Sequence, residues 1–412
     1  MEPDDEFRQG AAHAKEILRA AAEHDIPSLK KCLDAYAFEN CESVDVQDPD
    51  TGFSPLHAAI SGCRTITPSG SLQSGKTTVA TNDTQASSSE LTNGTQTRGV
   101  ETVQYLLENG AIWNQLNNRD ETPGCLARRL GFEQLYQMMV DAGVRAEVLL
   151  NRLDGYEELQ DEEENEDEDP ATDGAPSETS ADPQISVGEV GQVTSKAYLS
   201  STLSLTVDKL LDEQQNGVMM EWERGIMQQS ADAILGEAGL KVLNVGFGMG
   251  IIDTYIQQHP NKPAEHHIIE AHPDVLADMQ KKGWSEMPGL TIHAGKWQDV
   301  LPQLVAEGET FDAIYFDTFA ESYGQFREFV SENVIGLLTP SGKWSFFNGM
   351  GADRQISYDV YQKVVEMDMF ESGFDVEWTE IALPPLEKAW EGVRRKYWDI
   401  EKYRLPLCKF MD

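Results

Sequence analysis

A glycine-rich run follows an apolar stretch in the second half of the chain, at residues 246–250 (Gly-Phe-Gly-Met-Gly). Glycine lets the backbone approach a ligand closely, and a helix that begins directly after such a loop turns its N–H groups toward polar ligand atoms. Residues 251–258 have the composition of that helix, and residues 242–245 that of a buried strand before it. The pattern predicts a nucleotide-type pocket where this strand ends.

The details of the pattern disfavour a dinucleotide. A dinucleotide fingerprint needs G-x-G-x-x-G, and Ile251 stands where the third glycine belongs. Glu270 ends the next expected strand, where a carboxylate can accept hydrogen bonds from both ribose hydroxyls of an adenosine, although a strand-end carboxylate can also simply face water. With Ala271 and His272 beside it as further candidates for the pocket wall, this arrangement favours S-adenosylmethionine over NAD.

Two later segments add candidates to the same pocket. Trp297 and Gln298 follow a third short strand at residues 290–293 and could lie against the adenine edge, although a tryptophan there could equally be core. Asp317 follows the strand at residues 311–316, at the sheet edge where open α/β folds bind ligands. We therefore count Asp317 among the groups that contact the cofactor as well as among the candidate reacting groups.

Four spaced segments together resemble guanidinoacetate methyltransferase: residues 218–227 (Val-Met-Met-Glu-Trp-Glu-Arg-Gly-Ile-Met), 245–250, 267–270 and 311–318. Together with the N-terminal region described below, nearly the whole chain resembles the fungal protein arginine methyltransferase 2 family. The resemblance implies methyl transfer from S-adenosylmethionine to the internal δ nitrogen of an arginine, with a ribosomal large-subunit protein as the substrate. We do not find the paired-glutamate hairpin or the Thr-His-Trp loop of the common arginine methyltransferases.

The resemblance also implies roles for individual residues. Glu223 would orient the guanidinium, and Asp317 would orient it and accept its proton. Physical chemistry agrees, because a guanidinium has a pKa above about 12, presents planar N–H groups that suit carboxylates, and must lose a proton to attack a methyl group. The resemblance also implies that Tyr198 closes the pocket and that Met219 and Met227 lie against the methionine part of the cofactor. The loop that contacts the cofactor would consist of Phe247, Gly248, Met249, Gly250, Ile251 and Ile252. Methionine at helical spacing is more often core, so Met219 could be core instead.

Strands alternating with helices must position these residues. We expect strands at residues 242–245, 267–270, 290–293, 311–316 and 342–347, with helices at 251–258, 273–282 and 325–338. This alternation predicts a parallel sheet covered on both faces. The fold class is therefore α/β, a Rossmann-like class I methyltransferase domain over residues 186–412.

The N-terminal region is expected to be a small all-α, ankyrin-like domain over residues 1–150. Apolar residues at helical spacing predict a helix pair over residues 11–33 with a turn at 24–27. Residues 51–60 resemble the T-P-L-H-x-A signature of ankyrin repeats, and residues 103–127 resemble a degraded copy. Residues 65–99 are mostly polar, which predicts a disordered insertion.

Acidic residues dominate the expected linker at residues 151–185, which should be disordered because its charges repel one another. The formal charge of −39 argues against direct binding of nucleic acid and favours a basic protein partner. No apolar run suits a membrane span, and the acidic N-terminus does not resemble an export signal, so we expect residence in the cytoplasm and nucleus. Five cysteines without paired spacing indicate reduced thiols and no metal site.

These observations lead to one leading hypothesis and two rivals. The leading hypothesis is a protein-arginine δ-N-methyltransferase whose ankyrin-like array recruits a basic protein. The first rival is a small-molecule guanidino methyltransferase of the guanidinoacetate type with an appended interaction module. The second is a non-catalytic ankyrin adaptor that binds cofactor without reacting, although Glu223 and Asp317 are both present.

Overall fold

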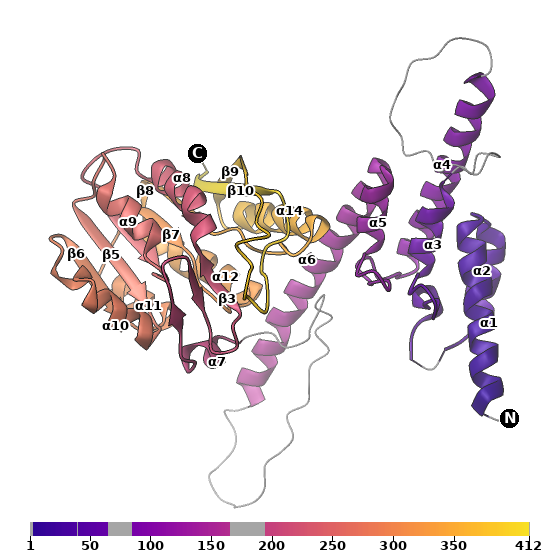
Figure 1. Ribbon diagram of the computed structural model, residues 1–412, viewed down its shortest axis with the longest axis horizontal. Coiled ribbons are helices and arrows are strands. Elements are labelled where there is room, and N and C mark those ends of the chain that lie inside the picture. The colour runs from indigo at the N-terminus through magenta and orange to yellow at the C-terminus, as the bar shows by residue number, and fades with distance from the viewer. Residues whose placement is uncertain (1–2, 39, 65–84, 165–193, 412) are drawn as a thin grey trace, which may run out of the picture. The chain divides into compact units, whose positions relative to one another are not determined.

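The computed structural model describes residues 3–38, 40–64, 85–164 and 194–411. The chain divides into two compact units, Met1–Gly188 and Glu189–Asp412 (Figure 1). Each unit is described by itself below. Within the described ranges, no helix combines the length and the apolar character that crossing a membrane requires.

The described part of the N-terminal unit is helical, as expected. Its helices are α1 (Pro3–Ala22), α2 (Ile26–Ala35), α3 (Pro55–Gly62), α4 (Gln85–Glu108), α5 (Pro123–Leu130) and α6 (Glu133–Glu164), with a short 3-10 turn at Ser43–Asp45. The expected helix pair is confirmed as α1 and α2, and the turn falls at the expected residues. Helix α3 packs against α1, α4 and α5, while α6 packs against α4 and α5.

Two similar turns start α3 and α5. The hydroxyl of Ser54 accepts a hydrogen bond from the backbone N–H of His57, and that of Thr122 accepts one from Cys125 at 3.1 Å. A proline follows each cap, which suits the first turn of a helix because proline lacks the N–H that would stay unbonded there. The ring of buried His57 hydrogen-bonds the carbonyl of Glu121 at 2.9 Å and so joins the two turns. The ankyrin-like identity of this unit stays a prediction.

Two expectations of disorder are partly wrong. Residues 85–99 belong to helix α4 rather than to a disordered insertion, and residues 151–164 belong to helix α6 rather than to a disordered linker. Both stretches extend helices that are anchored elsewhere by packed side chains, such as Val103 and Leu106 of α4. Extending an existing helix fixes one residue per hydrogen bond, so polar and acidic residues can join it without burying apolar surface. Residues 65–84 and 165–193 lie outside the described residues.

The C-terminal unit is built on a mixed sheet. Its strands are β4 (Lys241–Val245), β5 (Glu265–Glu270), β6 (Leu290–Ala294), β7 (Phe311–Phe316), β8 (Leu338–Phe346), β9 (Phe374–Ala382) and β10 (Lys402–Phe410). The spatial order is β6-β5-β4-β7-β8-β10-β9, in which β4 to β8 run parallel and β10 is antiparallel to both β8 and β9. This is a Rossmann-like α/β fold, and the five expected strands are confirmed.

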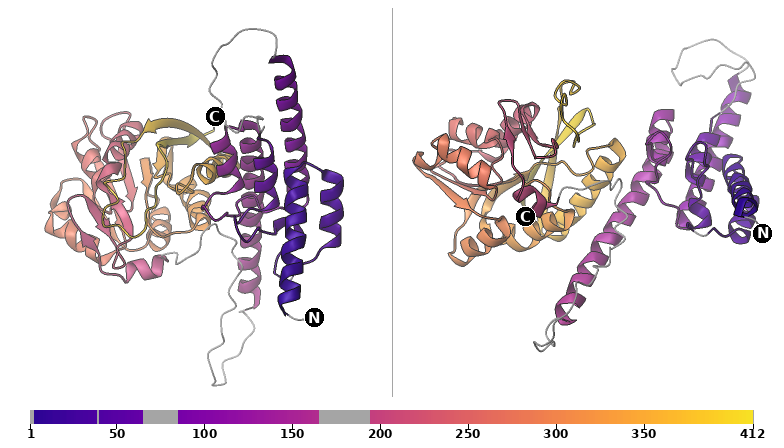
Figure 2. Two further views of the ribbon diagram at one scale, coloured as in Figure 1. Left: turned by 45° about the vertical axis from the view of Figure 1, so that its right-hand side comes forward. Right: turned by 60° about the horizontal axis from the view of Figure 1, so that its bottom comes forward.

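Helices cover both faces of this sheet (Figure 2), and side chains that alternate along the strands pack beneath them. Val242, Ala313 and Tyr315 pack on one face with the helices α8 (Arg224–Ile234) and α9 (Ile251–Gln258). Their strand neighbours, including Leu243 and Ile314, pack on the other face. That face is covered by α11 (Trp297–Ala306), α14 (Gln355–Glu371) and the helical run α12 (Tyr323–Glu328), η4 (Phe329–Val334) and α13 (Ile335–Leu337).

The sheet has one point at which the strand order reverses. From β4 the chain moves outward through β5 to β6, and it then returns to β7 on the other side of β4. The loops after β4 and β7 therefore leave in opposite directions and open a crevice at their carboxyl ends, the usual ligand position in open α/β sheets. A second, smaller sheet lies before β4 in sequence: β1 (Ser204–Leu205), β2 (Lys209–Leu211) and β3 (Gly217–Met220).

Candidate functional site

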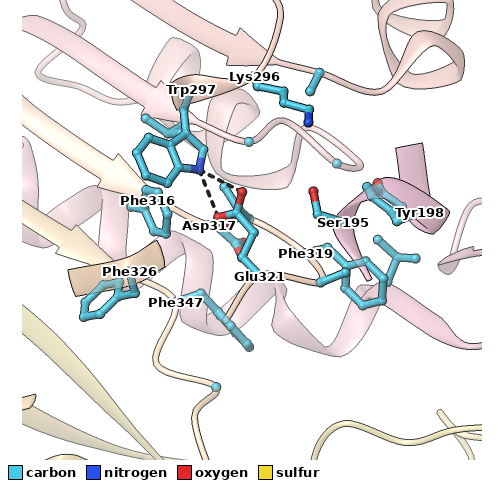
Figure 3. A pocket seen from close by; sticks show the side chains of 18 of the residues that line it. Ser195, Tyr198, Lys296, Trp297, Phe316, Asp317, Phe319, Glu321, Phe326 and Phe347 are labelled. Atoms are coloured by element: carbon cyan, nitrogen blue, oxygen red, sulfur yellow. Dashed lines mark hydrogen bonds between the residues drawn. The ribbon is translucent and has the colours of Figure 1, made fainter. Parts of the chain in front are cut away.

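A cavity of about 420 Å³ lies where the parallel strands end. That volume is within the range of about 300–1,000 Å³ that is typical of small-molecule sites. Its wall draws on the short helix α7 (Ser195–Leu199), on β3, on the loops after β4, β5, β6 and β7, and on the segment before β10. Figure 3 shows side chains from these elements around the hollow.

The glycine loop is shaped by two close approaches. Gly246 has a φ of +93°, and a Cβ there would lie 1.9 Å from the carbonyl oxygen of Asp317. Gly248 has a φ of +55°, and its Cβ would lie 3.0 Å from the sulfur of Met219. Only glycine is free of a Cβ and accepts these dihedral angles readily. The two glycines therefore let the loop after β4 pass directly beside the end of β7 and the end of β3.

Glu270 lies against this loop, as the sequence pattern predicted. Its carboxylate accepts hydrogen bonds from the backbone N–H groups of Phe247 at 3.0 Å, Gly248 at 3.3 Å and His272 at 2.7 Å. Burial raises the pKa of Glu270, while these backbone donors oppose that rise. Glu270 and Ala271 both line the cavity, so this carboxylate orders the loop and also reaches the ligand space.

Trp297 and Gln298 both line the cavity, and Trp297 is also packed in the core of the sheet's second face. Trp297 is therefore both a core residue and part of the cavity wall, and its contact with the adenine stays a prediction. Its indole nitrogen donates to both carboxylate oxygens of Glu321, at 2.8 and 2.9 Å (Figure 3). Gln298 donates to the same carboxylate at 3.3 Å, and the hydroxyl of Thr318 donates at 2.7 Å. Glu321 is not among the residues predicted from the sequence, because an acid a few residues after β7 is only a weak local signal.

Tyr198 closes one side of the cavity from helix α7. Its ring lies 4.9 Å from the rings of His272 and Phe319, measured between centroids. His272 does not line the cavity, because it is buried beneath Tyr198 and its ring nitrogen hydrogen-bonds the Tyr198 carbonyl at 3.1 Å. His272 therefore packs behind Tyr198 and holds its backbone in place, whereas Tyr198 and Ala271 line the cavity.

Glu223 and Asp317 meet in the cavity wall although they lie far apart in sequence. Glu223 is buried, and one oxygen, Oε1, accepts hydrogen bonds from the Met220 N–H at 2.8 Å and from the hydroxyl of Tyr397. Asp317 is partly buried, and its Oδ2 is shielded from solvent without any hydrogen-bond partner. Burial raises the pKa of both carboxyls, and the charge of Glu223 raises that of Asp317 further.

These electrostatics indicate what the cavity can bind. Four acidic side chains line it, Glu223, Glu270, Asp317 and Glu321, and among its described lining residues Lys296 is the one cation. A buried carboxylate oxygen without a partner is unfavourable unless a ligand supplies a donor. A cationic, planar donor between Glu223 and Asp317 would satisfy both groups. The described residues offer no cluster of three or more His, Cys, Asp or Glu side chains that could hold a metal ion.

Several predicted contact residues do not line the cavity. Met227 is fully buried between the sheet and α8, where it accepts a hydrogen bond from the Tyr315 hydroxyl at 3.3 Å, so its prediction as a cofactor wall is corrected to core. Phe247 points the other way, against Trp284 at 5.0 Å. The side chains of Met249, Ile251 and Ile252 pack in the α8–α9 core, and Gly250 caps α9 with a φ of +71°. Met219, for which a core position was the alternative, packs in the core and also lines the cavity.

The reason for these corrections is the geometry of a tight loop. Neighbouring side chains on it point in different directions, so a run of six consecutive residues cannot face one ligand. Gly246 and Gly248 face the cavity, whereas the side chains of the loop's other residues hold it in place. Their backbone groups remain candidates for contact, as the N–H of Phe247 shows by pointing at Glu270.

Comparison with known proteins places this geometry in a family. Residues 196–383 match the family model of guanidinoacetate N-methyltransferase. The chain is 56% identical to protein arginine N-methyltransferase 2 of Aspergillus fumigatus, over 97% of this chain and 96% of that one. It is 57% identical to the protein of the same name from Aspergillus oryzae, over 97% of each chain, and 43% identical to that from Neurospora crassa, over 96% and 95%. The chain therefore belongs to the protein arginine N-methyltransferase 2 family and uses S-adenosylmethionine as its methyl donor.

Proposed function

We propose that the chain methylates the internal δ nitrogen of an arginine in a basic protein of the large ribosomal subunit, and that it does so in the cytoplasm and nucleus. The observation that carries the proposal is the unpartnered, buried Oδ2 of Asp317 in the same cavity wall as buried Glu223. Two carboxylates without a cation of their own suit a guanidinium, which is cationic, planar and rich in N–H donors.

The two carboxylates have different parts in this proposal. One oxygen of Glu223 is already held by two donors, so this side chain is fixed and can orient the substrate. Asp317 has a free, desolvated oxygen with a raised pKa, which suits it to take the proton that the guanidinium must lose. The bound cofactor supplies an electrophilic methyl group on a sulfonium centre. The chain's own residues hold the nucleophilic nitrogen in line with it and exclude water.

Charge favours a protein-bound arginine over a small guanidino acid. Guanidinoacetate carries a carboxylate, which would need a cationic partner inside the cavity. Lys296 lies beside Trp297 in sequence and in Figure 3, at the wall predicted for the adenine. An arginine within a protein has no such carboxylate, so the acidic wall attracts its side chain without a penalty. We also propose that the N-terminal unit is an ankyrin-like module that recruits the basic partner.

The test uses the full chain with isotopically labelled S-adenosylmethionine. A fraction of basic large-subunit ribosomal proteins is one substrate, and guanidinoacetate is the other. We expect label in a ribosomal protein, and mass-spectrometric fragmentation should place the methyl group on the internal nitrogen. Label in guanidinoacetate alone would support the small-molecule rival, and label on a terminal nitrogen would refute the δ assignment. No label in either substrate, with normal cofactor binding, would support the adaptor rival.

A further inference from the structure

The segment between β9 and β10, residues 383–401, is tied to the β2–β3 hairpin. The side chain of Lys209 donates to the carbonyl of Glu391 at 2.9 Å, and the N–H of Arg394 donates to the carbonyl of Gln215 at 2.8 Å. The N–H of Gly217 donates to the carbonyl of Arg395 at 3.3 Å. These bonds hold the aromatic part of the segment beside the start of α8, where Glu223 lies.

Tyr397 is the residue of this segment that reaches the cavity. Its ring packs edge-on against Trp390 at 5.0 Å and lies beside Gly217, where a Cβ would come within 3.1 Å of the ring. Its hydroxyl donates a hydrogen bond to Oε1 of Glu223. The absence of a side chain at Gly217 therefore provides the space in which Tyr397 reaches the carboxylate.

This contact determines which oxygen of Glu223 remains available. Oε1 accepts from both the Met220 N–H and the Tyr397 hydroxyl, while no hydrogen bond from the described residues reaches Oε2. We propose that Tyr397 is a positioning residue for methyl transfer: it locks Oε1 of Glu223 and so presents Oε2 to the substrate guanidinium. This inference rests on the proposed function, because it assumes that a guanidinium enters the cavity.

The charges around Glu223 give Tyr397 a second effect. Among the described residues, the titratable groups that face Glu223 are Asp317, Tyr315, Tyr397 and Tyr403, and none of these four is a cation. Burial raises the pKa of Glu223 to about 7, and the hydrogen bonds from Tyr397 and Met220 oppose that rise. Without the Tyr397 hydroxyl the pKa of Glu223 would be higher still. A larger fraction of the enzyme at neutral pH would then hold a protonated Glu223 that accepts cations poorly.

The test is Tyr397→Phe in the full chain, which removes the hydroxyl and keeps the ring. For a large-subunit protein that the wild type labels, we expect kcat/KM to fall by about tenfold to a hundredfold, the range for one hydrogen bond to a charged group. The acidic limb of the pH profile of kcat/KM should move to higher pH by about one pH unit, because the lost hydrogen bond from Tyr397 favoured the ionised form of Glu223. Affinity for S-adenosylmethionine should stay unchanged.

Two further variants serve as controls. Tyr358→Phe removes a buried hydroxyl that accepts hydrogen bonds from Asn348 and Arg404, outside the cavity wall, so it should lower stability without moving the pH profile. Gly217→Ala would press on the Tyr397 ring and should give an intermediate loss with a smaller shift. If Tyr397→Phe lowers stability and activity together and leaves the pH limb in place, the hydroxyl has only a structural role.

A binding measurement separates this inference from the proposed function. Ethylguanidine, a guanidinium without a carboxylate, can be titrated calorimetrically across pH in the presence of S-adenosylhomocysteine. We expect wild-type binding to weaken as the pH falls through about 7 and the Tyr397→Phe curve to lie at higher pH. Coincident curves would overturn the role of Tyr397, even if ribosomal proteins are methylated. Separated curves with no protein methylation would instead refute the proposed substrate.

Discussion

Replacing Asp317 by Asn should separate cofactor binding from turnover. The substitution keeps the size of the side chain but removes its charge and its ability to accept a proton. Oδ2 of Asp317 is buried and has no hydrogen-bond partner, so the change breaks no hydrogen bond to that oxygen in the unliganded protein. The effect should therefore appear when a guanidinium binds and reacts, and we expect affinity for S-adenosylmethionine to change by less than about threefold.

The magnitude follows from the environment of the carboxylate. Removing one partner of a buried charge pair destabilises it by about 3–5 kcal/mol. At about 1.4 kcal/mol per tenfold, kcat/KM for the arginine substrate should fall by about 10²-fold to 10⁴-fold. The loss should lie mainly in kcat if Asp317 also accepts the proton, because that step occurs only in the transition state.

The Asp317→Asn substitution should lower activity but should not lower the stability of the unliganded protein. Burial, with smaller effects from Glu223 and Asp253, raises the pKa of folded Asp317 above its ordinary value of 3.8. A raised folded-state pKa means that the favourable contribution of this carboxyl is complete below 3.8 and is lost as the pH rises toward the folded-state pKa. Asparagine cannot ionise. The unliganded variant should therefore be at least as stable as the wild type at neutral pH, with the difference growing as the pH rises from acid.

The assay combines calorimetric titration of S-adenosylmethionine, steady-state methylation and thermal unfolding at several pH values. A wild-type rate for Asp317→Asn would rule out the proton role. A loss of cofactor affinity as large as the loss of turnover would mean that Asp317 acts in cofactor binding alone and has no separate part in the reaction. Lower stability of the variant at neutral pH would contradict the electrostatic reasoning.

Other substitutions test the parts of the site that the structure brings together. Gly246→Ala places a Cβ 1.9 Å from the carbonyl of Asp317, so we expect destabilisation of at least about 3 kcal/mol in urea unfolding and loss of cofactor binding. Glu321→Gln replaces the carboxylate that accepts the hydrogen bond from the Trp297 indole N–H. The KM for S-adenosylmethionine should rise by about tenfold while kcat stays near the wild-type value. An unchanged KM would show that Glu321 does not contribute to the cofactor site. Asn244→Ala removes the amide that donates hydrogen bonds to the Gly246 carbonyl and to the buried carboxylate of Asp253 in α9. We expect the free energy of unfolding to fall by about 1–3 kcal/mol in the same assay. An unchanged free energy of unfolding would mean that these hydrogen bonds do not stabilise the loop.

Much of the C-terminal fold could be predicted because its local signals agree with one another. The five expected strands, the helix at Ile251–Gln258 and the glycine loop all follow from apolar runs bounded by glycine or polar residues. The closing strands β9 and β10 could not be delimited, because a hairpin at the edge of a sheet is defined by its pairing partner rather than by its own pattern. The helical extensions at residues 85–99 and 151–164 were missed, because composition does not reveal that a packed helix continues into a polar stretch.

The kind of site could be predicted from local sequence features. A strand, a glycine loop without a third glycine and an acid at the next strand end are local features, and they predict an adenosine pocket at a sheet edge. The resemblance to guanidinoacetate methyltransferase then implied that Glu223 and Asp317 bind a guanidinium. Both residues line the cavity in the structure.

Which side chains face that cavity depends on how distant segments pack together in the fold. Met227 and Phe247 pack only in the core, whereas Met219 packs in the core and also lines the cavity, because the direction of each side chain depends on the segments that pack against it. Tyr397 had no local signal and Glu321 had only a weak one, since each contacts a partner distant in sequence, Glu223 in one case and Trp297 in the other. The burial that raises the pKa of Glu223 and Asp317 likewise arises only when distant segments enclose them. Residue types determined the chemistry available here, and the fold determined which groups can take part in it.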